Sequence, residues 1–411
     1  MIYNINNLYN NIYNNYNIID IETNLITKEF SIYKQSPKFI LGGVLRKDSI
    51  SRQYRDITQF RDDIMAGERA LVGHNISYDI IVTASQDKHF RDYVLNNHRL
   101  FIWDTAVCEY MLSGQTKKYP SLKDSAIHNN LQVSKDDEVS EMMKAGIDPE
   151  TILEVNPELL ERYLNSDLLV TEALFSTQLE VLKSFGKALL NLILQRQWFL
   201  LNTIRMSITG MPFDVVSAKD ESEVLSIQVK ALKDSIEATM AEVINSHTSG
   251  NLVPQAEEDD YFLHTMEERS IQVEPANCNS NPQLLAVFFG GDVEVSCNGV
   301  TGVYKTGARK GEPKYKTVRF SHKIPGFLPF TRTSLDDATL SEIAKGDYGK
   351  ASELAKTLRE YRTLTKKLGT YYEPYIAACK DGRIHCDYNH TATPTGRITA
   401  SKPNLQNVEG D

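Results

Sequence analysis

Two carboxylates stand close together in an apolar stretch near the start of the sequence. Asp20 and Glu22 are two positions apart in "NIIDIET", so both side chains leave the same face of a predicted strand. Like charges at this separation repel each other unless a cation lies between them. The pair alone does not establish a metal site, because a D-x-E triplet in a strand is a chance or surface feature in most proteins.

Two further pairs of polar side chains follow. "LVGHNISYD" places Asn75 and Asp79 where a strand turns into a helix, and "ERYLNSD" places Tyr163 and Asp167 at i and i+4, on one face of a helix. Each pair also has a structural interpretation: Asn75 as a cap, Asp79 as a first-turn residue that favours the helix dipole, and Tyr163 with Asp167 as an amphipathic boundary. Four carboxylates gathered around one small site would suit Mg²⁺ or Mn²⁺.

Alternating strands and helices must position these residues. "NIIDIET", "KFILGGVLR" and "ALVGHN" are predicted strands, and "PELLERYLNSDLLVTEALFSTQLEVLKSF" is a predicted long helix. They indicate an α/β domain with a mixed sheet over residues 17–180. Two long helices are expected in residues 181–250, as an antiparallel pair projecting from the body, and residues 250–275 are expected to form an acidic loop.

The remaining chain is predicted to be helical around a basic hairpin. Helices are expected in "NPQLLAVFF", "SLDDATLSEIAK" and "KASELAKTLREYRTLTKKLGTYYEPYIAAC", and strands with tight turns from "GRIHCDYN" onward. The hairpin, residues 304–323, carries seven Lys or Arg against one Glu. It is either a solvated surface hairpin or a loop that follows a nucleic-acid backbone. Its candidate phosphate contacts are Lys305, Arg309, Lys310, Lys314 and Lys316.

Composition limits the class of protein. The 411 residues have room for two or three domains, and no apolar run is long enough for a membrane-spanning helix. The Asn/Tyr-rich start lacks the features of a secretory signal. Five cysteines without a CxxC spacing indicate reduced thiols in a cytosol-like compartment and argue against a zinc cluster. The net charge of -9 disfavours nucleic acid as a partner only if the charge is spread evenly.

The order D-x-E, N-x3-D, Y-x3-D resembles the three motifs of the DEDD-type 3'-5' exonucleases, in their tyrosine-bearing branch. The resemblance covers about residues 17–180 and implies a ribonuclease H-like fold. It implies that Asp20, Glu22, Asp79 and Asp167 hold two divalent cations (Mg²⁺ or Mn²⁺), with Asp20 bridging them, and that Tyr163 positions the attacking water. It also places Thr23 and Asn75 at the substrate.

The second half of the sequence resembles the family A (Pol I-like) DNA polymerases. "GRIHCDYNHTATPTGRITASKPNLQN" is similar to the stretch before that family's polymerase active site, "LREYRTLTKKLGTYYEPYI" to its helix from thumb to palm, and "TGMPFDVVSA" and "NPQLLAVFFGG" to its thumb. The implied fold is a mainly helical thumb followed by the start of an α+β palm. The implied DNA-binding residues are Thr395, Gly396, Arg397, Asn404, Gln406 and Asn407, with Lys366 and Lys367 as candidate phosphate contacts.

The motifs that this family uses for nucleotide addition do not occur in the sequence. These are D-x-S-x-x-E, the helix carrying R-x3-K-x6-YG, and H-D-E. We therefore expect a proofreading exonuclease, joined to a DNA-holding thumb and early palm, whose nucleotidyl-transfer residues come from a second polypeptide. A split bacteriophage replicative polymerase in the bacterial cytoplasm is the preferred source, and a truncated product is the alternative.

The expected division of the chain follows from both resemblances. It comprises an N-terminal segment 1–16, an exonuclease domain 17–184, a thumb 185–357 with a basic insertion 291–330, and the start of a palm 358–411. Two other functions remain open: a catalytically silent DNA-binding scaffold subunit of a polymerase, and a free-standing RNA-trimming exonuclease. The complete carboxylate set disfavours the first, and the TGR and NLQN motifs, which have no use in RNA trimming, disfavour the second.

Overall fold

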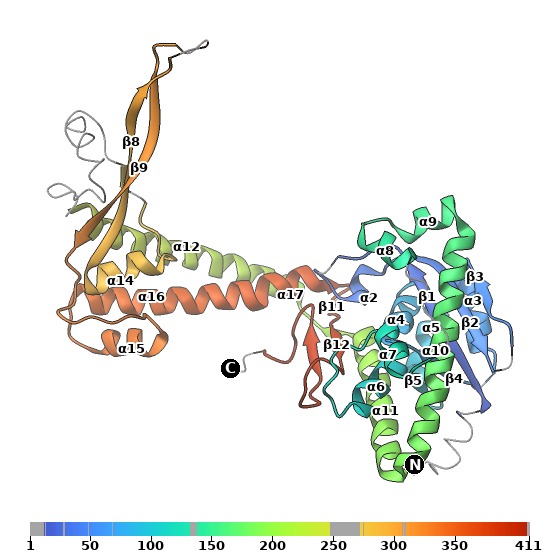
Figure 1. Ribbon diagram of the computed structural model, residues 1–411. Coiled ribbons are helices and arrows are strands. Elements are labelled where there is room, and N and C mark those ends of the chain that lie inside the picture. Colours follow the sequence, from blue (N-terminus) through green and yellow to red (C-terminus); the bar gives the residue numbers. More distant parts are fainter. Residues whose placement is uncertain are drawn as a thin grey trace. The chain divides into compact units, whose positions relative to one another are not determined.

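The chain folds into two compact units in a computed structural model, and each is described by itself (Figure 1). One unit comprises Met1–Val215 and Pro374–Asp411, and the other comprises Val216–Glu373. The structure describes residues 12, 14–27, 29–47, 49–67, 69–131, 138–246, 272–273, 275–305, 307 and 310–408. The predicted N-terminal segment and acidic loop lie almost wholly outside these residues.

A five-stranded mixed sheet forms the centre of the first unit. Its order is β3-β2-β1-β4-β5, with the bounds β1 Tyr16–Thr23, β2 Phe39–Arg46, β3 Arg52–Tyr54, β4 Ala70–Gly73 and β5 Ile102–Asp104. β1 pairs antiparallel with β2 and parallel with β4. The predicted mixed sheet is confirmed, and the strand that carries Asp20 and Glu22 is its middle strand.

Helices cover both faces of this sheet. They are α2 Ile32–Gln35, α3 Ile57–Met65, α4 Ser77–Gln86, α5 Lys88–Asn96, α6 Thr105–Leu112, α7 Leu122–His128, α8 Glu138–Lys144, α9 Pro149–Val155, α10 Pro157–Phe185 and α11 Lys187–Thr209. Ile18 lies in one hydrophobic core with Leu164 and Leu168 of α10, whereas Ile19 lies in a second core with Ile80 of α4. Because successive side chains of a strand point to opposite faces, β1 is buried on both.

Local sequence determines the bounds of α10, which carries Tyr163 and Asp167. Asn156 caps its start by accepting a hydrogen bond from the Leu159 N–H (3.3 Å), Pro157 occupies its first turn, and Gly186 ends it with a φ of 83°. These are favoured residues for the two ends of a helix. A Cβ on Gly43 of β2 would lie 2.6 Å from Leu168 Cδ1, so a glycine at this position lets α10 approach the sheet closely.

Helix α11 belongs to the first unit, and the predicted antiparallel pair projecting from the body is wrong. Ile193 joins the core that contains α10, and Ile204 and Ile208 join the core that contains α4. Burial of these apolar side chains against the sheet domain outweighs pairing with the next helix. The expected exonuclease boundary at residue 184 therefore differs from the compact-unit boundary at Val215.

The second unit packs helices against one another and against a long hairpin. Its elements are α12 Val215–Ser246, β7 Gln272–Val273, α14 Asn281–Phe289, β8 Gly291–Val303, β9 Pro313–Ile324, α15 Asp337–Lys345, α16 Lys350–Lys367 and the π-helix Leu368–Tyr372. Ile236 and Met240 of α12 share one core with Phe288 of α14 and Leu358 of α16. β7, β8 and β9 form one sheet, so a hairpin is confirmed, but its first strand, β8, precedes the expected range 304–323.

The last residues return to the first unit as short strands. After α17 (Glu373–Ala378) come β10 Cys379–Lys380, β11 Arg383–Ile384, β12 Asp387–Asn389 and β13 Thr399–Ser401. β11 pairs with β6, Met211–Pro212, at the end of α11. Among the described residues, no helix combines the length and apolar character needed to cross a membrane.

Candidate metal-binding active site

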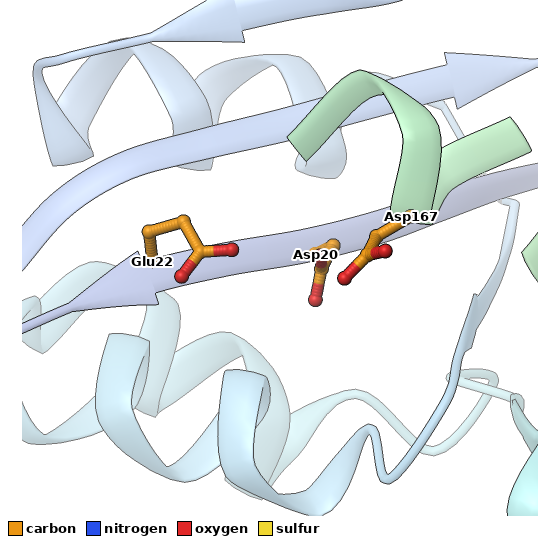
Figure 2. A group of neighbouring side chains, drawn as sticks. All are labelled: Asp20, Glu22 and Asp167. Atoms are coloured by element: carbon orange, nitrogen blue, oxygen red, sulfur yellow. The ribbon is translucent and has the colours of Figure 1, made fainter. Parts of the chain in front are cut away.

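Three carboxylates from two distant segments converge above the sheet. Each of Asp20, Glu22 and Asp167 offers an oxygen, and these oxygens all lie within 4.8 Å of one another. Figure 2 shows Asp20 and Glu22 on β1 and Asp167 reaching toward Asp20 from α10. Asp167 and Glu22 are buried, and Asp20 is half-buried. The two-residue period of the strand places Asp20 and Glu22 on one face of the sheet. The packing of α10 on that sheet brings Asp167 close to them.

Asp79 lies beside this group at the start of α4. Its Oδ1 accepts a hydrogen bond from the Ile21 N–H (3.0 Å), between the two strand carboxylates. Burial raises the pKa of Asp79 well above its usual value, and the charge of Asp20 raises it further. Asp79 is therefore a neighbour of the three carboxylates whose oxygens lie within 4.8 Å of one another, without being one of that group, and repulsion from Asp20 opposes its ionisation in the absence of a cation.

The donor set fits hard divalent cations. All four side chains offer carboxylate oxygens, the ligands that Mg²⁺ and Mn²⁺ prefer. Their converging negative charges would be neutralised by cations of this kind. The residues that would hold the cations are Asp20, Glu22, Asp79 and Asp167.

The other predicted exonuclease residues either lie near the carboxylates in the chain or line the same cleft. Tyr163 is buried on α10, one turn before Asp167. The Thr23 hydroxyl donates to the Asn24 carbonyl (3.0 Å) and lies 2.5 Å from the Tyr78 hydroxyl. Burial raises the pKa of Tyr78 to about 12, so its phenol stays protonated at neutral pH. Tyr78 is a neighbour of the site that the sequence analysis missed, although it directly precedes Asp79.

Asp104 fixes the turn that leads to Asp79. Its Oδ1 accepts hydrogen bonds from the backbone N–H groups of Asn75 (3.0 Å), Ala106 (2.8 Å) and Val107 (3.3 Å). Asn75, exposed, has a φ of 61°, a left-handed conformation that asparagine tolerates better than most residues. Burial raises the pKa of Asp104 to about 6. The sequence analysis missed Asp104; its signal was the "WDTA" stretch, where an aspartate can cap a helix.

A cleft of about 390 Å³ opens at the carboxylates. Asp20 and Asp167 line the cleft, and Asn389 and Thr391 of the C-terminal segment also line it. The other lining residues are His74, Asn75, Ala106, Tyr119, Pro120, Ser121, Leu122 and Thr171. Sequence reasoning placed Asn75 at the substrate but missed Asn389 and Thr391, because their motif was assigned to duplex DNA only.

Most of the predicted duplex-contacting residues are exposed on this C-terminal segment. Thr395, Arg397, Asn404, Gln406 and Asn407 are exposed, and Gly396 is half-buried with a φ of 71°. The Gln406 side chain accepts from the Ala400 N–H (3.2 Å) and donates to the Ile398 carbonyl (3.1 Å). Gln406 therefore stabilises its own turn. This structural role is the alternative to the predicted contact with DNA.

The basic candidates lie in the second unit. Lys366 and Lys367 are exposed at the end of α16, and the Lys367 ammonium lies 5.8 Å from the centre of the Tyr372 ring. Lys305 and Lys310 are exposed between β8 and β9. Arg309 and the side chains of Lys314 and Lys316 lie outside the described residues.

Buried polar contacts hold the C-terminal segment against α11 and α6. Arg196 Nη2 donates to the carbonyls of His390 (3.0 Å) and Gly396 (2.9 Å), and the Tyr110 hydroxyl donates to the Thr393 carbonyl (2.6 Å). His390 Nε2 lies 2.8 Å from Thr203 Oγ1. Since that hydroxyl also lies 2.9 Å from the Leu200 carbonyl, to which it donates, the imidazole donates through Nε2.

His390 makes folding stability depend on pH. Burial, with Arg196 nearby, lowers the pKa of His390 from 6.5 to about 3. Below pH 6.5 the unfolded chain binds a proton at this histidine, whereas the folded chain does not bind it until about pH 3. The contribution of His390 to folding stability is therefore complete above pH 6.5 and decreases as the pH falls. Between pH 7 and pH 5, His390→Gln is expected to lose about 2 kcal/mol less unfolding free energy than wild type. Urea titrations measure this. The exposed His98→Gln should follow wild type, and equal losses in all three proteins would contradict the assignment.

Comparison with known proteins supports a polymerase relationship in the last part of the chain. The family model described as DNA polymerase family A matches residues 322–410. A thermostable DNA polymerase I of Thermus thermophilus is 44% identical over 61 residues, 14% of this chain and 7% of the relative. DNA polymerase I of Pseudomonas aeruginosa is 38% identical over 77 residues, 18% of this chain and 8% of the relative.

A solved structure extends the likeness in fold to nearly the whole chain. The POL domain of Pol1 from M. smegmatis, solved with DNA primer-template and dNTP, has a TM-score of 0.55 and 15% sequence identity. The match covers 98% of this chain and 54% of that chain, so this chain spans about half of the solved polymerase. The chain therefore shares the fold of part of a Pol1 polymerase domain, and its residues 322–410 match the family A DNA polymerase model.

Proposed function

We propose that the chain is a metal-dependent 3'-5' proofreading exonuclease that acts on DNA. Its ribonuclease H-like domain is joined to the DNA-holding thumb and early palm of a family A polymerase with a role in replication. The observation that carries the proposal is the convergence of Asp20, Glu22 and Asp167, with Asp79 hydrogen-bonded between the two strand positions. A mixed sheet with the first two residues on its middle strand supports the same assignment.

The proposed reaction is hydrolysis of the terminal phosphodiester. Water adds to the phosphorus, the bond from phosphorus to the O3' of the preceding nucleotide breaks, and a 5'-mononucleotide leaves. A pair of divalent cations held by the four carboxylates would supply activated water and stabilise the leaving oxygen. Tyr163 would orient the water, and Asn75 would contact the terminal nucleotide. Asp104 would keep the turn before Asp79 in place.

The family A region would hold the duplex part of the substrate. Arg397 is exposed there and offers donors suited to the minor groove, whose acceptors are similarly placed in all base pairs. Thr395, Asn404 and Asn407 would lie along the same duplex. The M. smegmatis neighbour was solved with a primer-template, which supports a DNA partner for this fold.

The basic hairpin is expected to contribute salt-dependent affinity. Replacing Lys305, Arg309, Lys310, Lys314 and Lys316 by glutamine should weaken duplex binding and flatten the dependence of log Kd on log salt by about 0.9 for each phosphate that is no longer neutralised. Binding titrations at several salt concentrations measure the slope. Lys88→Gln with Lys183→Gln, at exposed positions of the first unit, is the control. An unchanged slope would assign the hairpin to a protein partner.

The family's nucleotidyl-transfer motifs are not among these 411 residues, so the reaction proposed for these residues is trimming and not nucleotide addition. The test of the proposed function is trimming of a 5'-labelled single strand and of a primer-template with Mg²⁺. Stepwise removal of 3' nucleotides supports it. A folded protein that binds DNA without trimming it would instead be a scaffold subunit.

A further inference from the structure

Residues of the family A region, 322–410, form part of the lining of the cleft at the carboxylates. Asp20 and Asp167 contribute anionic groups, whereas Asn389 and Thr391 contribute neutral polar groups from the opposite end of the sequence. All four residues belong to one compact unit. A volume of about 390 Å³ lies within the range usual for small-molecule sites. The cleft therefore combines candidate metal-binding carboxylates with residues that the exonuclease motifs do not include.

The hydrogen bonds of Asn389 determine which of its atoms is available. Its Oδ1 accepts from the backbone N–H of Thr391 (2.8 Å) and from the Thr391 hydroxyl (3.2 Å). A backbone N–H can only donate, so the atom facing it must be the oxygen of the carboxamide. Nδ2, which carries two protons, is then the end of Asn389 left to contact another molecule. Asn389 is half-buried and ends β12.

The segment that carries Asn389 is held firmly in place. The next residue, His390, is buried and hydrogen-bonded to Thr203, and its carbonyl accepts from Arg196 (3.0 Å). Tyr110 of α6 anchors the Thr393 carbonyl. These contacts come from the same unit as the carboxylates, so they tie the backbone around Asn389 to the domain that carries the carboxylates.

We propose that Asn389 is a substrate-binding residue of the exonuclease site, donating from Nδ2 to an acceptor oxygen of the 3'-terminal deoxynucleotide. This inference rests on the proposed function and names a residue that serves the same site. The carboxylates would hold the cations that bind the scissile phosphate, and a neutral donor lining the same cleft would bind the nucleoside that the phosphate carries. The family A region thereby helps to form the trimming site as well as to hold duplex DNA.

Two variants of Asn389 separate loss of the donor from loss of the fold. Asn389→Asp preserves the size of the side chain and the acceptor for Thr391 but removes the Nδ2 protons, and Asn389→Ala removes both. Each is expected to raise the Kd for dTMP, measured by calorimetry with Mn²⁺, by about tenfold, the effect of one lost hydrogen bond. The KM for trimming should rise to a similar degree while kcat changes little. Asn96→Ala, at an exposed position of α5, is the control.

The outcomes distinguish this inference from the proposed function. If wild type trims DNA and both Asn389 variants bind dTMP within twofold of wild type, the inference is overturned and the exonuclease stands. If dTMP binding weakens in both variants while Asn96→Ala is unchanged, the inference holds. If wild type does not trim but its dTMP binding still depends on Asn389, the nucleotide site holds and the exonuclease proposal fails.

Discussion

Replacing Asp20 and Glu22 together by alanine is expected to lower Mg²⁺-dependent trimming of a single-stranded 3' end by at least about a thousandfold. The two side chains supply half of the four candidate ligands, and their oxygens lie within 4.8 Å of an Asp167 oxygen. Cations in such a site stabilise the transition state by several kcal/mol, and each 1.36 kcal/mol lost is a tenfold fall in rate. Single-turnover degradation of a 5'-labelled strand measures the effect.

The matched control is Asp92→Asn, which removes an exposed carboxylate of α5 and should trim like wild type. A second readout does not depend on activity. Mg²⁺ should raise the unfolding free energy of wild type by RT ln(1 + [Mg²⁺]/Kd), and the double variant should lose this increase. Trimming that persists in the double variant would exclude Asp20 and Glu22 as the metal-holding pair.

Asp104→Ala is expected to lower the free energy of unfolding by about 3–5 kcal/mol. Asp104 is buried, and its carboxylate accepts from three backbone N–H groups at distances of 2.8 to 3.3 Å. Each buried donor left without a partner costs about 1–3 kcal/mol. The variant also frees the turn at Asn75 that precedes Asp79, so trimming should fall by about 10–100-fold, the usual cost of losing a residue that positions a metal ligand.

Asp56→Ala is the control for this substitution. Asp56 caps α3 with hydrogen bonds to the N–H groups of Thr58 and Gln59 but is exposed, so its loss should cost only about 1 kcal/mol and leave trimming unchanged. Asp104→Asn keeps an acceptor oxygen and should recover part of the stability. Urea denaturation together with the trimming assay tests both effects. An equal loss of unfolding free energy in Asp56→Ala and Asp104→Ala would contradict the claim that burial makes the hydrogen bonds of Asp104 more stabilising.

Features that depend on neighbours along the chain could be predicted from the sequence. The bounds of α10 agree with the predicted helix Pro157–Phe185, because the cap residue Asn156, Pro157 and the terminal Gly186 act within a few positions. The same holds for the common face of Asp20 and Glu22 on β1, which follows from the period of a strand. The four carboxylates come from three short motifs, and the resemblance of their order to the DEDD-type exonucleases implied a shared site.

Features that depend on contact between distant segments were decided by tertiary structure. Asp167 meets Asp20 because α10 packs closely on the sheet at Gly43, and α11 joins this domain because Ile204 and Ile208 complete its core. Asn389 reaches the cleft through anchors on α11 and α6. No local sequence pattern specifies these contacts, since burial stabilises any apolar face that fits against its neighbour. The sequence by itself determined which groups could do chemistry, and only packing decided which of them share a site.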